Sequence, residues 1–399
     1  MATAWSRHLR SFGSPPRHAW EVTVGDRTGI QWTDASWNPI VGCSIVSPGC
    51  TNCYAMKMAA RIESIDAAAA MGRYNQAAAG FLDYGTEQQR ADALQLLEPR
   101  THYAGTTTRV KDKTVWTGKM ALAPDTILTQ PLRWKRPRRV FVNSMGDLFH
   151  ESVPDEWIDR VFAVMALAPQ HSFQVLTKRS ARMRDYVNGK KFSVPILGAM
   201  PLERVHLEAA AHFEGDGGFW DEIKKAGNVY SLYCSVPWPL PNVWLGVSAE
   251  DQRRWDERIP DLKETPAAER FVSAEPLLGP IVGDMAGLDW IIVGGESGPG
   301  SRPMHPDWAR SIRDQCAAAG VPFFFKQWGD WCDERQATAQ GCAPGADMFG
   351  ADGMPRGDRW HFYDGDDVIG GAAIRIGKRA AGRLLDGIEH NAMPERAHG

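Results

Sequence analysis

The sequence predicts an α/β fold built on a parallel sheet, arranged as a partial or complete TIM-like (β/α) barrel with helical and loop insertions. Short apolar runs recur along the chain, amphipathic helical patterns separate several of them, and polar or small residues follow each run. Strands that are apolar throughout are typical of a parallel sheet, which is buried on both faces. Seven runs fit a barrel better than a small open sheet, and a doubly wound sheet is the alternative.

The predicted strands are distributed from residue 29 to residue 330. In chain order they are GIQWTDAS (29–36), RRVFVNSMGD (138–147), SFQVLTKRS (172–180), NVWLGVSAED (242–251), RFVSAEPL (270–277), LDWIIVGGESG (288–298) and VPFFFKQWGD (321–330). Two of the intervening segments have apolar residues at helical spacing. They are PDEWIDRVFAVMALAP and HPDWARSIRDQCAAAG, and Gly320 ends the second.

The domain organisation follows from where this rhythm begins and where it is interrupted. Residues 1–26 form a Pro- and Gly-containing N-terminal arm, and residues 27–330 form the barrel. An alanine-rich helical segment at about 55–115 and a Gly-, Pro- and aromatic-rich segment at about 184–241 interrupt it as insertions. Residues 331–399 form a C-terminal extension that is rich in loops and then helical around GKRAAGRLLDG.

Composition limits the class of protein. The formal net charge of −3 gives no global signal for nucleic-acid binding, so any such contact requires a local patch. No run of about 18 apolar residues occurs, so we expect no membrane-spanning helix. Seven cysteines, three of them within eleven residues, fit metal binding in a reducing compartment better than a disulfide framework. We therefore expect a cytoplasmic protein.

The strongest motif is WNPIVGCSIVSPGCTNCYA, in which Cys43, Cys50 and Cys53 have the spacing C-x6-C-x2-C. Thiolate ligands select zinc, copper(I) or iron–sulfur clusters. A structural zinc site needs four protein ligands, and the nearest histidine downstream is His102. A 4Fe–4S cluster with three cysteine ligands therefore fits best. Zinc completed by a distant residue and a set of buried free thiols are the alternatives.

Polar and glycine residues at the ends of the predicted strands are the candidate ligand-binding groups. In parallel α/β folds, ligands bind at the carboxyl ends of the strands. Carboxylates there can bind ribose hydroxyls or a substrate, and lysines can bind a carboxylate or a phosphate. The candidates are Asn143, Lys178, Glu250, Ser273, Glu275, Gly294, Gly295, Glu296 and Lys326.

The early three-cysteine loop followed by α/β units resembles the radical S-adenosylmethionine (SAM) superfamily, whose usual spacing, C-x3-C-x2-C, is three residues shorter. The chain is more closely similar to an uncharacterised phage-type three-cysteine-motif family, a domain of unknown function found in phages and bacteria. The segments that carry this resemblance are TGIQWTDASWNPIVGCSIVSPGCTNCYA, FVNSMGDLFH, VLTKR, WLGVSAED, SAEPLLGPI, WIIVGGESG and FFFKQWG.

The resemblance implies a 4Fe–4S cluster on the three cysteines, with an open iron that binds SAM. It also implies an electron donor such as flavodoxin or ferredoxin. The Gly-Gly-Glu stretch at Gly294–Glu296 resembles the stretch that contacts the SAM amino group in radical SAM proteins, and Glu275 and Lys178 are further candidate SAM contacts.

The substrate prediction depends on the basic run RWKRPRRV at residues 133–140. Five cations around Trp134 can follow a phosphate backbone while the indole stacks on a base. We therefore expect a nucleotide or nucleic acid as the substrate of a SAM-cleaving enzyme. The alternative function is a non-catalytic nucleic-acid-binding protein stabilised by an iron–sulfur cluster or by zinc.

Overall fold

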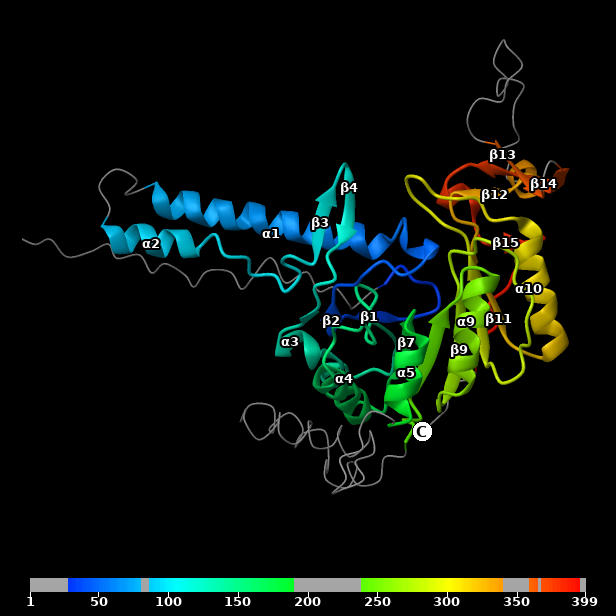
Figure 1. Cartoon of the computed structure of the whole chain (residues 1–399), viewed down its shortest axis with the longest axis horizontal. Coiled ribbons are helices and arrows are strands. Elements are labelled where there is room, and N and C mark those ends of the chain that lie inside the picture. Colours follow the sequence, from blue (N-terminus) through cyan, green and yellow to red (C-terminus); the bar gives the residue numbers. More distant parts are fainter. Residues whose placement is uncertain (1–27, 80–85, 190–237, 340–358, 365–366, 395–399) are drawn as a thin grey trace, which may run out of the picture.

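Seven parallel strands form the central sheet of the computed structural model, which describes residues 28–79, 86–189, 238–339, 359–364 and 367–394 (Figure 1). The strands of this sheet occur in the same order in space and along the chain, and the sheet forms a half-barrel. In spatial order the strands are β1 (Ala35–Trp37), β6 (Arg139–Val142), β7 (Ser172–Thr177), β8 (Val243–Ser248), β9 (Glu269–Ala274), β10 (Trp290–Gly294) and β11 (Phe323–Gln327). The predicted α/β class and the parallel sheet are confirmed, and each predicted run supplies one strand.

Besides the arm between β1 and β6, which is described below, helices connect four of the other five successive strand pairs. They are α4 (Asp155–Leu167), α5 (Ser180–Val187), α9 (Gln252–Lys263) and α10 (Pro306–Ala319). Pro154 precedes α4, and Gly320 ends α10 in the left-handed conformation at φ +69°. The described connection between β9 and β10 contains no helix. Both helices that the sequence predicts are therefore present, within one or two residues of the expected bounds.

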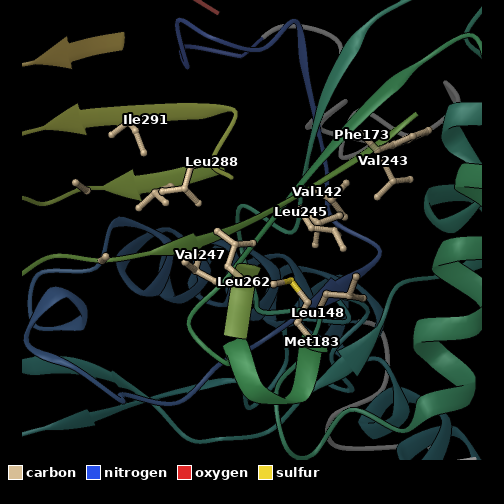
Figure 2. Close-up of a cluster of buried hydrophobic side chains, with 14 of the residues drawn as sticks. Val142, Leu148, Phe173, Met183, Val243, Leu245, Val247, Leu262, Leu288 and Ile291 are labelled. Carbon is tan, nitrogen blue, oxygen red and sulfur yellow. The ribbon is translucent and has the colours of Figure 1, made fainter. Parts of the chain in front are cut away.

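The core lies between the sheet and these helices. Figure 2 shows side chains of the strands, among them Val142, Leu245 and Ile291, against Met183 of α5 and Leu262 of α9. All five are at most 2% exposed. Alternate residues of the same strands point to the other face of the sheet.

Aromatic side chains fill part of this second face. Trp244, Phe271 and Trp290 form a buried cluster there with Trp32 and Phe324. These residues lie in the middle and amino-terminal part of their strands, which leaves the carboxyl edge of the face free for smaller and polar side chains.

An arm projects away from the sheet between β1 and β6 (Figure 1). It consists of α1 (Tyr54–Ala78), α2 (Glu87–Gln95) and the hairpin of β3 (Thr107–Val110) and β4 (Lys113–Trp116). This arm corresponds to the predicted insertion at about 55–115. Shorter elements join it to the sheet: β2 (Ile40–Val41), η1 (Pro48–Cys50), β5 (Ala121–Leu122), α3 (Asp125–Leu128) and η2 (Gln130–Arg133).

The C-terminal extension adds a small antiparallel sheet. Its described elements are β12 (Trp331–Asp333), α11 (Glu334–Ala339), β13 (Arg359–Asp364), β14 (Asp367–Arg375), α12 (Lys378–Ala381), β15 (Leu384–Leu385) and β16 (Ile388–Glu389). The helix expected around GKRAAGRLLDG is a single turn, α12, and a short hairpin follows it. The predicted N-terminal arm and most of the second insertion lie outside the described residues. Among the helices that the structure describes, none is long and apolar enough to span a membrane.

Candidate metal centre

The three cysteines of the motif lie on one loop, residues 43–53, which we call the cysteine loop. The backbone fixes its start. Gly42 adopts φ +98°, and a Cβ there would lie 2.1 Å from the Lys119 carbonyl oxygen, so glycine is required. The Gly118 N–H donates to the Cys43 carbonyl oxygen at 3.2 Å. Cys43 is therefore held between the sheet and the base of the arm.

An arginine from the end of β7 contacts the first thiol. Arg179 Nη1 donates to Cys43 Sγ at 3.4 Å and to Asp147 Oδ2 at 3.0 Å, while Nη2 donates to Ser44 Oγ at 2.7 Å. Burial raises the pKa of Cys43 to about 12; Asp147 adds to the rise and Arg179 opposes it. A metal that binds this thiolate displaces a proton, and Arg179 places a cation beside the sulfur.

Asp147 joins the ends of β6 and β7 beneath this contact. It accepts hydrogen bonds from Thr177 Oγ1 at 2.7 Å and from the Lys178 N–H at 3.1 Å, besides the one from Arg179. His150, in the same NSMGDLFH segment, lies 2.9 Å from Ser44 Oγ through Nε2. Burial, more than any neighbouring charge, lowers the pKa of this imidazole. The segment after β6 therefore supports the cysteine loop.

Glu250, at the end of β8, anchors the middle of the cysteine loop. Its side chain is fully buried, accepts from the Gly49 N–H at 3.2 Å and pairs with Arg258 of α9 at 3.0 Å. Burial alone would raise the pKa of Glu250, but Lys178, Ser47 and Arg258 hold it below its usual value. The carboxylate is therefore ionised, and it binds the loop at Gly49, the residue before Cys50.

Glu296, two residues beyond β10, anchors the other side of Cys50. Oε2 accepts from Asn52 Nδ2 at 2.9 Å and from Arg302 Nε at 2.9 Å, and Oε1 accepts from Arg302 Nη2 at 2.6 Å. Asn52 also donates to the Gly300 carbonyl oxygen at 2.8 Å. Both carboxylate oxygens are thus engaged by the protein. Hydrogen bonds from Arg302 are the main reason that the pKa of Glu296 is lowered despite burial.

The remaining two cysteines lie at a 3₁₀ turn and at the start of a helix. Ser47 Oγ lies 3.7 Å from Cys50 Sγ across the 3₁₀ turn η1. Cys53 is the residue that precedes the first turn of α1, a helix of 25 residues. The amino end of a helix favours negative charge, including that of a thiolate. The electrostatic setting of Cys53 therefore differs from that of Cys43.

Other predicted site residues form a separate group at the ends of β9, β10 and β11. Lys326 Nζ pairs with Glu275 at 2.7 Å. A Cβ on Gly294 would lie 3.2 Å from the Glu275 carboxyl group, so these residues are packed together. The Gly295 N–H donates to the Gln327 carbonyl oxygen at 2.9 Å, within the sheet. Within the residues that the structure describes, neither Glu275 nor Lys326 makes a hydrogen bond to the cysteine loop.

Two further candidates have different positions. Asn143 adopts φ +58°, is 4% exposed, and its Oδ1 accepts from the Ile40 N–H at 3.3 Å, so it positions the strand that leads to the cysteine loop. Ser273 lies next to Ser248 on the neighbouring strand. Both serines belong to the face of the sheet that carries the aromatic cluster, on its carboxyl side.

The basic run at residues 133–140 does not belong to this site. It precedes β6 and therefore lies at the amino edge of the sheet, whereas the cysteine loop lies at the carboxyl edge. Trp134 is only 8% exposed; its ring meets His171 edge to face at 5.7 Å and lies under Arg138 at 4.8 Å. The prediction that Trp134 stacks on a base is wrong, because the indole is packed in the core.

Three arginines were not identified from the sequence as partners of the site residues. Arg258 follows Glu250 by eight residues and Arg302 follows Glu296 by six, so each pair is a local signal that a search for buried carboxylates could use. Arg179 was recognisable only as a cation at a strand end. Its contact with Cys43 spans 136 residues and depends on the fold.

The described side chains do not form a ready site for a single metal ion. In the part of the chain that the structure describes, no three His, Cys, Asp or Glu side chains converge closely enough to hold one ion. Ligands of one zinc ion lie about 2.3 Å from it and hence on the order of 4 Å from one another. The three thiols of the cysteine loop form no disulfide.

Comparison with known proteins gives one match. Residues 27–394 match a family model described as a protein of unknown function (DUF5131). No curated protein and no solved structure matches the chain.

Proposed function

The chain belongs to the DUF5131 family, and because that family has no assigned activity, we propose a function from the cysteine loop: an iron–sulfur enzyme that cleaves SAM reductively. Cys43, Cys50 and Cys53 would hold a 4Fe–4S cluster. Three protein ligands leave one iron for SAM, as in the radical SAM proteins that the loop resembles. The parallel half-barrel is compatible with a partial TIM-like fold of that kind.

The observation that carries the proposal is that the loop is already fixed without its thiols. Glu250 and Glu296 bind it on either side of Cys50, and Arg179 binds it at Ser44. A structural zinc ion supplies folding energy to a segment that lacks such anchors. Here the ion-paired carboxylates supply the anchoring, so the thiols remain available for a reactive centre.

The cluster held by Cys43, Cys50 and Cys53 would supply one electron for the reductive cleavage of a sulfonium C–S bond of SAM to methionine and a 5′-deoxyadenosyl radical. An electron donor such as flavodoxin or ferredoxin would restore the electron. The chain's own residues orient the reactants. Glu275 suits the SAM amino group or ribose hydroxyls, and Lys178 or Lys326 suits its carboxylate. Ser273 offers a hydroxyl on the same face. Contact of Gly294, Gly295 or Glu296 with SAM stays a prediction.

The test is anaerobic purification followed by iron and sulfide analysis. We expect a brown protein with about four irons per chain. Cys43→Ala, Cys50→Ala and Cys53→Ala should each lose most of the iron, whereas Cys316→Ala, in the buried face of α10, should retain it. Full iron in any of the three variants would refute the assignment of ligands. Addition of SAM should change the EPR spectrum of the reduced cluster, and an unchanged spectrum at saturating SAM would refute the enzyme.

One observation favours the second candidate, a non-catalytic protein with a structural cluster. Glu250 and Glu296 are saturated by protein donors, so two of the strand-end carboxylates serve the fold. The EPR experiment separates the candidates, because a structural cluster has no reason to respond to SAM. As the substrate of the enzyme we propose a nucleotide or nucleic acid.

A further inference from the structure

The helix that follows the cysteine loop has two unlike faces. On the inner face of α1, Met56 and Ala59 are buried against the arm. Both acidic residues of the helix also point this way. Glu63 accepts from the Thr106 N–H at 2.9 Å, and Asp66 accepts from the Arg100 N–H at 2.9 Å. The negative charges of α1 are thus used to fasten the segment that carries the β3–β4 hairpin.

The outer face of α1 is cationic and partly apolar. Tyr54, Lys57, Arg61 and Ile65 succeed one another at intervals of three or four residues, so they form one stripe. Tyr54 is 68% exposed and Ile65 59% exposed. The side chains of Lys57 and Arg61 are exposed and make no hydrogen bond or ion pair with any residue that the structure describes. No acidic residue interrupts the stripe, and it begins next to Cys53.

The hairpin adds three more cations to the same arm. Arg109, Lys111 and Lys113 are exposed around the β3–β4 turn, and within the described ranges their side chains are unpaired. Asp112 is the acidic residue among them. The base of the hairpin is joined to the cysteine loop through Gly118, so these charges are connected to the site by a short, ordered segment.

The site itself is bordered by exposed apolar side chains. Ile45 and Val46, between the first two cysteines, are 50% and 41% exposed, and Tyr54 follows the third. Large apolar groups that remain in water beside a cluster of functional residues mark a contact surface. The cationic stripe extends from this apolar border.

We propose that the outer face of α1, with Tyr54, Lys57 and Arg61, binds single-stranded nucleic acid. The inference rests on the proposed function, because it supplies the substrate class of the same site. Unpaired cations at one per helical turn can follow a phosphate backbone, and an exposed aromatic ring at the cysteine loop can stack on an unpaired base. In a chain of net charge −3, such a one-signed surface is complementary to a polyanion.

The placement also gives a reason for a single strand. The base that stacks on Tyr54 would lie one residue from Cys53, at the candidate reactive centre. Enzymes that act on a base need it outside the helical stack, which a single strand provides without the cost of flipping. The phosphates that follow would extend along α1.

The experiment is fluorescence anisotropy with a labelled oligo(dT) of about 20 nucleotides, using the full chain at several salt concentrations. For single strands, the slope of log affinity against log salt is about −0.7 for each phosphate contact, so Lys57→Gln with Arg61→Gln should reduce its magnitude by about 1.4. Tyr54→Ala should weaken binding roughly fivefold to 100-fold, and Tyr54→Phe should restore it, because the ring is retained.

The matched control is Lys135→Gln with Arg136→Gln, which also removes one lysine and one arginine charge, but from exposed positions at the amino edge of the sheet. It should leave affinity and slope unchanged. The proposal is overturned if oligo(dT) does not bind, if the control pair weakens binding as much as the arm pair, or if a duplex or poly-glutamate binds as tightly. The binding assay needs neither iron nor SAM. If the protein binds iron and SAM but not oligo(dT), only this inference is refuted. If the anaerobically purified protein lacks iron but binds oligo(dT) in a way that depends on Lys57 and Arg61, only the proposed function is refuted.

Discussion

Glu250→Gln tests whether the ion pair under the cysteine loop determines stability and loop order together. The change keeps the volume of a fully buried side chain and removes its charge. Arg258, with a side chain 6% exposed, then lacks its carboxylate, and the Gly49 N–H lacks a charged acceptor. Removing one partner of a buried ion pair costs about 3–5 kcal/mol. Arg258 keeps its 2.8 Å hydrogen bond to the Ser248 carbonyl oxygen, so we expect the lower end, about 3 kcal/mol.

That loss translates into a measurable shift. At about 2.1 cal/mol/K per residue, unfolding a chain of this length has an entropy of roughly 0.8 kcal/mol/K, so Tm should fall by about 4 °C. Hydrogen exchange should also accelerate in peptides that cover residues 48–53. The control is Glu257→Gln on α9, where the pair with Arg253 at 2.8 Å is exposed to solvent and contributes little to stability. A Tm within 1 °C of the wild type, with unchanged exchange in the loop, would refute the reasoning.

Three further predictions follow from single contacts. Gly295→Ala should abolish or severely reduce soluble folded protein, because its Cβ would lie 1.8 Å from the Trp328 carbonyl oxygen; a normal circular dichroism melt would contradict this. Burial and Asp289 raise the pKa of Glu269 to about 7, so the folded state binds the extra proton and wild-type stability should fall as pH rises from about 4.5 to 7. Glu269→Gln should remove that slope and raise Tm at pH 8, and parallel Tm–pH curves for the two proteins would disprove it. Glu296→Gln should keep the fold but weaken its arginine contacts by about 1.5–3 kcal/mol, seen as faster exchange at the cysteine loop; equal exchange rates would count against the anchor.

The strands and the cysteine loop were predictable because their signals are local. Apolar runs such as the one that ends at Glu250 identify a buried parallel strand, and the spacing of three cysteines identifies a loop of possible ligands. The carboxyl edge of the sheet follows from strand direction alone. These inferences need no knowledge of which distant residues meet.

The partners of those residues were not predictable, because contacts between distant residues depend on the fold. Glu296 was predicted to bind SAM, and that contact stays a prediction; the hydrogen bonds that its oxygens accept from Asn52 and Arg302 could not be predicted, because a sequence does not show which donors reach a carboxylate. The basic run around Trp134 has the composition of a nucleic-acid patch, yet its place at the amino edge follows from its position before a strand. Lys57 and Arg61 are separated by three residues and form no basic run in the sequence; the helix places them on one face.

Because α1 has 25 residues, the length of the arm can change at its far end without a change at the cysteine loop. The helix starts at the third cysteine and is about 37 Å long, and each turn removed from its outer half shortens it by about 5.4 Å without altering the first turn. A change of one or two whole turns keeps the remaining residues on the same side. Insertions and deletions at the far end of α1 are thus free to adapt the span of the arm, while the loop that bears the thiols stays under constant constraint.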